Sequence, residues 1–126
     1  MAFPMSDREV HIRAAKEKRA AAHDEFKRRR YTVVGDLAIK AVEQAIEAAA
    51  AMENKHFHVL PRTAHASRLE WVRQKFPSLS KDASELWGAY GTLGYEGEDG
   101  DRARKVLEAM ERVMNEISRT TTLRLR

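Results

Sequence analysis

The sequence predicts an all-α fold, an up-and-down bundle of four to five helices. Residues 33–52 form an alanine-rich segment whose apolar residues recur at spacings of three and four, which is the period of a helix with one broad buried stripe. Residues 103–117 repeat this period more cleanly. No two segments alternate apolar and polar residues as paired strands do. The two stripes comprise Val34, Leu37, Ala38, Ala41, Val42, Ala45, Ile46, Ala49 and Met52, and Ala103, Val106, Leu107, Met110, Val113, Met114 and Ile117.

The first helix is expected to begin at a capping box, Ser6-x-x-Glu9, and to run to about Arg28. Tyr31-Thr32 is expected to form a short turn, because β-branched valines follow a basic run at this point. A connection this short makes the first two helices antiparallel neighbours. The apolar residues of the first helix are Val10, Ala14, Ala21 and Phe26.

A third helix is expected from Ala64 to Phe76, with Thr63 as its N-cap. Pro61 and Pro77 delimit it, because proline interrupts the helical hydrogen bonds.

A fourth helix, capped by Ser78 or Ser80, precedes a glycine-rich acidic loop expected at Gly94–Gly100. Asp99 or Asp101 is expected to cap the last helix.

The composition indicates one domain, residues 1–126, with its core in Ser6–Arg119 and an extended tail at Thr120–Arg126. The chain has no cysteine, no apolar run of membrane length and no signal-peptide pattern at its start. We therefore expect a cytoplasmic protein without membrane contact. A charged fraction of 33%, with only two asparagines and two glutamines, is typical of a thermophile.

A basic run suggests contact with phosphate. The net charge is +4, and four consecutive cations precede an aromatic residue that is available to stack on a base. The same run also favours a helix C-terminus through the helix dipole, without any ligand. The candidate nucleic-acid contacts are Lys27, Arg28, Arg29, Arg30, Tyr31 and Arg73.

His65, Arg62 and Arg68 are the candidate catalytic residues. His65 and Arg68 are three residues apart and share a helix face, and Arg62 lies just upstream. An imidazole can move protons while a guanidinium stabilises charge on phosphate, which is the chemistry of RNA cleavage. The alternative interpretation is a solvated helix surface with a histidine in its first turn.

His56, His58 and His65 could together bind a metal ion, but their spacing matches no well-specified zinc motif. We interpret them as ordinary loop and cap histidines, and we expect no metal and no cofactor. The glycines that recur every third residue between residues 88 and 100 do not form a phosphate-binding loop, because no predicted strand precedes them and they match no phosphate-binding motif.

From Val10 to Ile117 the chain resembles a HEPN domain of the small, stand-alone prokaryotic kind. The resemblance rests on Arg29-Arg30-Tyr31 after an amphipathic helix, the alanine-rich segment Gly35–Ala51, and a histidine-bearing helix start at Thr63-Ala64-His65. An aromatic fourth helix and Gly94-Tyr95 before the last helix complete it. The resemblance implies a helical bundle that forms a homodimer.

Many HEPN domains are RNases of toxin–antitoxin or defence systems, or partners of minimal nucleotidyltransferases. Their RNase signature is an arginine followed after four to six residues by a histidine, near the start of a late helix. Here no histidine follows His65, and Arg62 is too close to it, so no catalytic role carries over. The resemblance therefore favours a protein that binds nucleic acid, a nucleotide or a nucleotidyltransferase partner without catalysis. The alternative is a divergent, metal-independent endoribonuclease.

Overall fold

The computed structural model describes residues 6–96 and 100–125, with the backbone alone over residues 90–96. Helices make up most of this part of the chain, and none of it forms a strand, which confirms the all-α prediction. No helix in the described ranges is both long enough and apolar enough to cross a membrane. The elements are α1 (Asp7–Lys27), α2 (Tyr31–Ala51), the 3₁₀ turn η1 (Phe57–Val59), α3 (Ala64–Lys75), the 3₁₀ turn η2 (Pro77–Leu79), α4 (Ser80–Glu96) and α5 (Gly100–Thr121).

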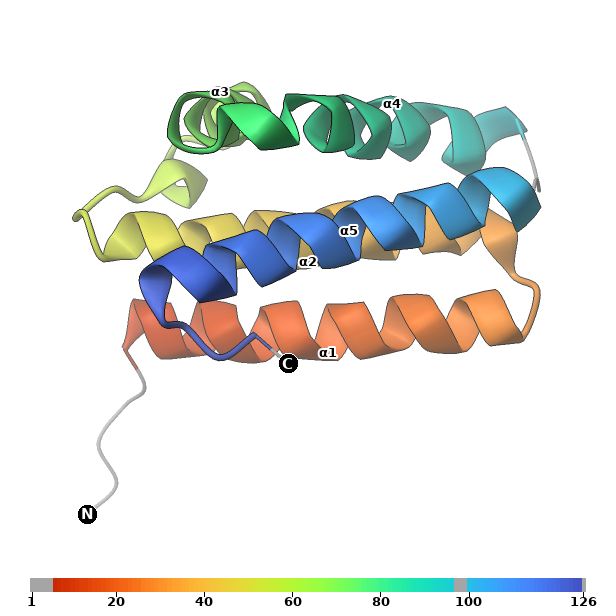
Figure 1. Cartoon of the computed structure of the whole chain (residues 1–126), viewed down its shortest axis with the longest axis horizontal. Coiled ribbons are helices and arrows are strands. Elements are labelled where there is room, and N and C mark those ends of the chain that lie inside the picture. The colour runs from red at the N-terminus through yellow and green to blue at the C-terminus, as the bar shows by residue number, and fades with distance from the viewer. Residues whose placement is uncertain (1–5, 97–99, 126) are drawn as a thin grey trace, which may run out of the picture.

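The central helix is α2, with α1 on one side of the layer formed by α2 and α5, and α3 and α4 on the other side (Figure 1). Ala38, Ala41 and Ala45 are fully buried, and their small side chains let α1, α4 and α5 approach α2 closely. The buried seams agree with the sequence prediction. Their fully buried members include Val34, Val42, Ile46, Val106, Met110, Val113 and Ile117. One chain covers most of the α2 stripe, although Leu37 and Met52 at its edge and end are only partly covered. The homodimer stays a prediction.

Some residues that the sequence analysis places among the apolar residues of a helix are more exposed than the fully buried seams. Val10 is 48% exposed and Met52 is 49% exposed, because both lie at helix ends, beyond most of the neighbouring helices. Leu37 is half-buried and packs at the edge of the core. The helical period therefore gives the direction of a side chain, but not how far the neighbouring helices extend.

The connection between α1 and α2 lies about two residues earlier than the turn that the sequence predicted at Tyr31-Thr32. The capping box at Ser6 and Glu9 forms as expected, but α1 ends at Lys27 and α2 already begins at Tyr31. Arg29 adopts a left-handed conformation, with φ of 60°. The N–H of Arg30 donates to the carbonyl of Glu25 at 2.9 Å, and the N–H of Arg29 to that of Phe26 at 3.0 Å. These bonds form a Schellman motif, which ends α1.

The last helices differ from the prediction at their ends. The fourth helix continues to Glu96, although the sequence predicted a loop from Gly94 onward. A glycine weakens a helix by about 1 kcal/mol but does not end it. Asp101 lies inside the first turn of α5 rather than at its cap, and Asp99 is outside the described residues. Thr63 occupies the N-cap of α3 without a side-chain capping hydrogen bond.

The C-terminal segment contributes to the core. The last helix extends to Thr121, and Leu125 is 1% exposed, so the segment predicted as an extended tail is helical in its first residues and buried near its end. Leu123 is half-buried against the same core. Figure 1 shows this segment turning back at the end of α5.

A charged cluster of three residues joins α1 to α5. Arg19 binds Glu111 through two N–H···O contacts of 2.6 and 3.0 Å, and His23 Nε2 lies 2.8 Å from Glu111 Oε1. Burial is the largest single influence on the pKa of Glu111, and it raises that pKa. The combined effect of Arg19 and His23 lowers the pKa by more than burial raises it, so the net pKa is below the ordinary value. The carboxylate is therefore a stable anchor between the two helices.

Replacing Val113 with aspartate should lower the free energy of unfolding by more than about 3 kcal/mol, because Val113 is completely buried and the new carboxylate has no partner. The half-buried Leu37 serves as the comparison, and Leu37→Asp should cost clearly less. Urea unfolding followed by circular dichroism measures both changes. A Val113→Asp variant as stable as the parent would contradict the position of the core.

A buried carboxylate cluster as the candidate functional site

Two glutamates on the central helix are buried. Glu43 is 5% exposed and Glu47 is 1% exposed. They are four residues apart on α2, which places them one above the other on the same face of the helix. Buried carboxylates are rare unless they are paired, so their partners define the candidate site.

Arg68 bridges both carboxylates from α3. Its Nη1 lies 2.8 Å from Glu43 Oε2 and its Nε lies 3.2 Å from Glu47 Oε2. The Arg68 side chain is 12% exposed. These contacts fix α3 against α2.

The connection between α2 and α3 supplies a second partner. In η1, both the backbone N–H and the side-chain Nδ1 of His58 lie near Glu47 Oε1, at 3.0 and 2.9 Å. Burial is the largest single influence on the pKa of Glu47, and it raises that pKa. The combined effect of His58 and Arg68 lowers the pKa by more than burial raises it. The net pKa of Glu47 is therefore below its ordinary value, and the carboxylate remains ionised while buried.

Two more histidines complete the cluster. His65 Nδ1, in the first turn of α3, lies 2.5 Å from Glu43 Oε2. On α1, His11 is 8% exposed and its Nδ1 lies 2.6 Å from Gln44 Oε1. The rings of His11 and His58 meet edge-on with centroids 4.9 Å apart. We call this group the carboxylate cluster, and it comprises Glu43, Glu47, Arg68, His11, His58 and His65.

The charge of the carboxylate cluster limits its chemistry. With neutral histidines, two carboxylates and one guanidinium leave a formal charge of −1. Such a group repels a phosphodiester and attracts a cation. The guanidinium of Arg68 is already bound to both carboxylates, which makes it poorly suited to bind the phosphate of a substrate.

The structure brings together only part of the predicted catalytic set. His65 and Arg68 meet through Glu43, while Arg62 is exposed, and no described contact joins Arg62 to the cluster. The three histidines that the sequence analysis weighed as metal ligands, and interpreted as ordinary loop and cap histidines, each have a different hydrogen-bonding or ion-pair partner. His65 binds Glu43, His58 binds Glu47, and His56 Nε2 lies 3.4 Å from Asn54 Oδ1.

The predicted nucleic-acid contacts fall in two places. Residues 27–30 are exposed at the turn between α1 and α2, whereas Arg73 lies on α3, toward the other end of the bundle (Figure 1). Arg73 Nη2 lies 3.3 Å from Ser84 Oγ. Tyr31 is half-buried, and its ring lies 5.6 Å from that of Phe26. Tyr31 therefore packs against Phe26, and its ring is less open to a base than the sequence predicted.

The sequence prediction missed Glu43, Glu47 and His11. Polarity alone predicts that Glu43 and Glu47 lie on the solvated side of the second helix. A signal was present, because two carboxylates four residues apart stand in an otherwise alanine-rich segment, and His11 shares the helical period of the buried Ala15 and Ala22. The burial itself depends on the α2–α3 connection, which folds over this face.

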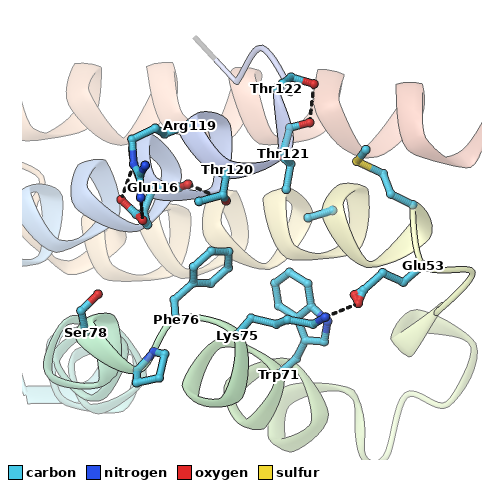
Figure 2. Close-up of a pocket in the computed structure, with 13 residues that line it drawn as sticks. Glu53, Trp71, Lys75, Phe76, Ser78, Glu116, Arg119, Thr120, Thr121 and Thr122 are labelled. Carbon is cyan, nitrogen blue, oxygen red and sulfur yellow. Dashed lines mark hydrogen bonds and ion pairs between the residues drawn. The ribbon is translucent and has the colours of Figure 1, made fainter.

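A groove of about 620 Å³ lies between the C-terminal ends of α2, α3 and α5. Trp71 and Phe76 line it, as Figure 2 shows. Its charges are paired internally, since Lys75 Nζ lies 2.6 Å from Glu53 Oε1 and Arg119 binds Glu116. The groove therefore has no net charge with which to attract an anionic ligand.

The comparisons with known proteins give no family. No protein-family model matches the chain, and searches of curated proteins and of solved structures find no match either. The fold and the cluster define a helical bundle with a buried histidine–carboxylate–arginine group. The resemblance to HEPN domains stays a prediction.

Replacing Arg68 with methionine should lower the free energy of unfolding by about 3–5 kcal/mol, because two buried carboxylates lose their charged partner. Arg73→Met is the matched control, since Arg73 lies on the same helix but is exposed, and it should change stability by less than about 0.5 kcal/mol. Chemical unfolding of both variants at neutral pH measures the difference. Equal stabilities would show that Arg68 does not anchor α3.

Proposed function

We propose that this protein binds nucleic acid through the turn between α1 and α2 and performs no chemistry on it. We call residues 27–30 the basic turn. All four residues are exposed. The observation that carries the proposal is the conformation of Arg29, a cation at a backbone position that favours glycine.

The basic turn has little internal neutralisation. Arg28 and Arg30 lie 3.8 and 3.6 Å from Glu25 Oε1, which are long contacts of exposed arginines and are worth little energy. Arginine is suited to phosphate because its planar fork donates two parallel hydrogen bonds. Several such side chains on one turn can track successive phosphates of a strand.

The backbone of Arg29 supports a role for its side chain. A left-handed conformation costs a residue with a Cβ roughly 1–2 kcal/mol, and glycine avoids this cost. The Schellman hydrogen bonds around Arg29 need only the backbone, so they do not account for an arginine here. A contact of the guanidinium with phosphate would account for it.

The position of Tyr31 favours contacts with phosphate over contacts with bases. Its ring packs on Phe26, and a Cβ built on Gly100 would lie 3.0 Å from the ring. The side chain is thus enclosed between α1 and the start of α5. Because phosphate contacts carry no sequence information directly, we expect binding that depends little on base sequence.

Arg29→Gly should separate stability from binding. It should raise the free energy of unfolding by about 1 kcal/mol through relief of the backbone. It should also weaken binding to a fluorescein-labelled single-stranded RNA of mixed sequence, and lower the slope of log affinity against log salt by about 0.7. Fluorescence anisotropy across a salt series measures the affinity, and urea unfolding measures the stability.

Asn54→Gly is the matched control, because Asn54 has a φ of 59° at the end of α2, away from the basic turn. It should relieve backbone strain without changing RNA affinity. If Arg29→Gly and the parent protein bind RNA equally tightly and with the same salt slope, the basic turn is not the binding site.

A second candidate is a metal-independent endoribonuclease that uses His65. The contact of 2.5 Å between Glu43 and His65 orients the ring, which is the arrangement of a base held by a carboxylate, and the side chain is 53% exposed. Against it stand the negative charge of the carboxylate cluster and the engagement of Arg68. Arg62, exposed and three residues before His65, is the cation that could contact a substrate.

Incubation of the pure protein with labelled RNA in the presence of a chelator tests this candidate. The parent should cleave if His65 is a base, and His65→Ala should lose the activity while His56→Ala keeps it. Cleavage that survives His65→Ala would remove the proposed base. No cleavage by the parent favours binding alone.

The finer assignments rest on the resemblance to HEPN domains. These are a nucleotide as the ligand, a minimal nucleotidyltransferase or a second copy of this chain as the partner, and a role in a toxin–antitoxin or defence system. A thermophilic source rests on the charged composition instead. They belong to this proposal together with a cytoplasmic location.

A further inference from the structure

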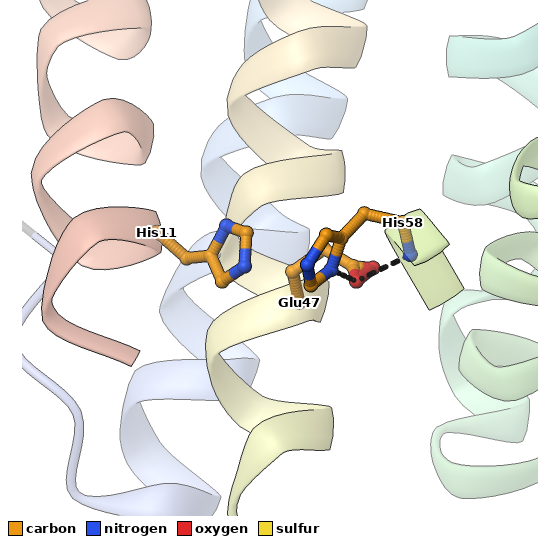
Figure 3. A group of neighbouring side chains, drawn as sticks. All are labelled: His11, Glu47 and His58. Atoms are coloured by element: carbon orange, nitrogen blue, oxygen red, sulfur yellow. Dashed lines mark hydrogen bonds and ion pairs between the residues drawn. The ribbon is translucent and has the colours of Figure 1, made fainter. Parts of the chain in front are cut away.

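We infer that His11, Glu47 and His58 form a binding site for a divalent transition-metal ion of the Zn²⁺ type. The three residues come from α1, α2 and η1, and they converge at the buried face of α2 (Figure 3). This site differs from the sequence expectation, which considered only His56, His58 and His65 and predicted no metal.

The distances are close to those of a zinc site. Each of the three residues offers one ligand atom, and these atoms all lie within 4.8 Å of one another. In a tetrahedral site with bonds of about 2.0–2.2 Å, ligand atoms lie roughly 3.3–3.6 Å apart. The atoms therefore need to converge by at most about 1.5 Å, a movement that rotation of side chains can supply. His58 lies in a three-residue 3₁₀ turn, where such a movement disturbs no helix.

The hydrogen bond of His11 prepares its ring for a metal. Its Nδ1 lies 2.6 Å from Gln44 Oε1, and because an amide oxygen only accepts, Nδ1 is the donor. A neutral ring then carries its lone pair on Nε2. Fixing the tautomer through the second nitrogen is the usual function of the group behind a metal-bound histidine.

The pair of His58 and Glu47 provides the other two ligand atoms. His58 Nδ1 and Glu47 Oε1 are 2.9 Å apart, and a metal ion bound by both atoms would replace the proton that they share in a hydrogen bond. The other oxygen of Glu47 accepts from Arg68 Nε at 3.2 Å. Arg68 thus holds the carboxylate in place while Oε1 faces the histidines.

Charge and donor type select the class of ion. The cluster has a formal charge of −1 before binding, which favours a cation. Two imidazoles and one carboxylate suit Zn²⁺, Co²⁺ or Ni²⁺, whereas Mg²⁺ and Ca²⁺ prefer oxygen donors alone. Three protein ligands leave a fourth position for water, and the His58 side chain is 35% exposed, which gives solvent access to the site.

Isothermal titration of the untagged, chelator-dialysed protein with ZnCl₂ tests the site. We expect one ion per chain and a raised melting temperature. Replacing His11 or His58 with glutamine should weaken binding by at least about 10- to 100-fold, since loss of a supporting group alone costs that much in known sites. His23→Gln is the matched control, because His23 also lies on α1 and pairs with a glutamate but has no third ligand nearby among the described residues. It should leave the affinity unchanged.

Titration with CoCl₂ gives a readout that does not depend on the variants. The parent complex should show the strong visible absorption of four-coordinate Co²⁺, and His58→Gln should lose it. Circular dichroism establishes that each variant is folded, and if both histidine variants unfold, the spectrum of the parent complex decides. A parent complex without this absorption, or a His23→Gln variant weakened as much as His58→Gln, would overturn the site.

Discussion

Two buried carboxylates on the central helix require a cation, and Arg68 supplies it. Desolvating a carboxylate costs several kcal/mol, so Glu43 and Glu47 can lie inside the bundle only because the guanidinium and the hydrogen bonds of His58 and His65 compensate for the lost water. These contacts place α3 and the α2–α3 connection. Only Ala64, Trp71 and Val72 of α3 are buried, so charge positions this helix as much as apolar packing does.

The same pairing separates the two proposed binding surfaces. The carboxylates that hold Arg68 also make the cluster negative, which directs phosphate away from it and cations toward it. The basic turn lies at one end of the bundle, where its arginines have only one glutamate, the half-buried Glu25, as a partner among the described ion pairs. Binding of a strand and binding of a metal ion therefore use different residues, and each can fail without the other.

The sequence predicted what depends on local periodicity. Val34 and Val113 lie in seams of helical spacing, and both are fully buried. It misplaced the first turn, because a left-handed residue is expected to be glycine and here is Arg29. It placed Glu47 in solvent, because polarity predicts exposure unless a distant partner is known, and Arg68 is 21 residues away. Contacts of this range follow from the fold and not from the pattern of one helix.

A metal ion in the proposed site would change the charge of the whole cluster. A formal charge of −1 would become +1, and the negative potential at the start of α3, where His65 lies against Glu43, would decrease. The repulsion that argues against a phosphodiester near His65 would then be weakened or lost. The endoribonuclease candidate is metal-independent, so its assay needs a chelator to remove any effect of a bound ion. Cleavage that appears only with Zn²⁺ would belong to the metal site. Cleavage without Zn²⁺ would belong to the Glu43–His65 pair.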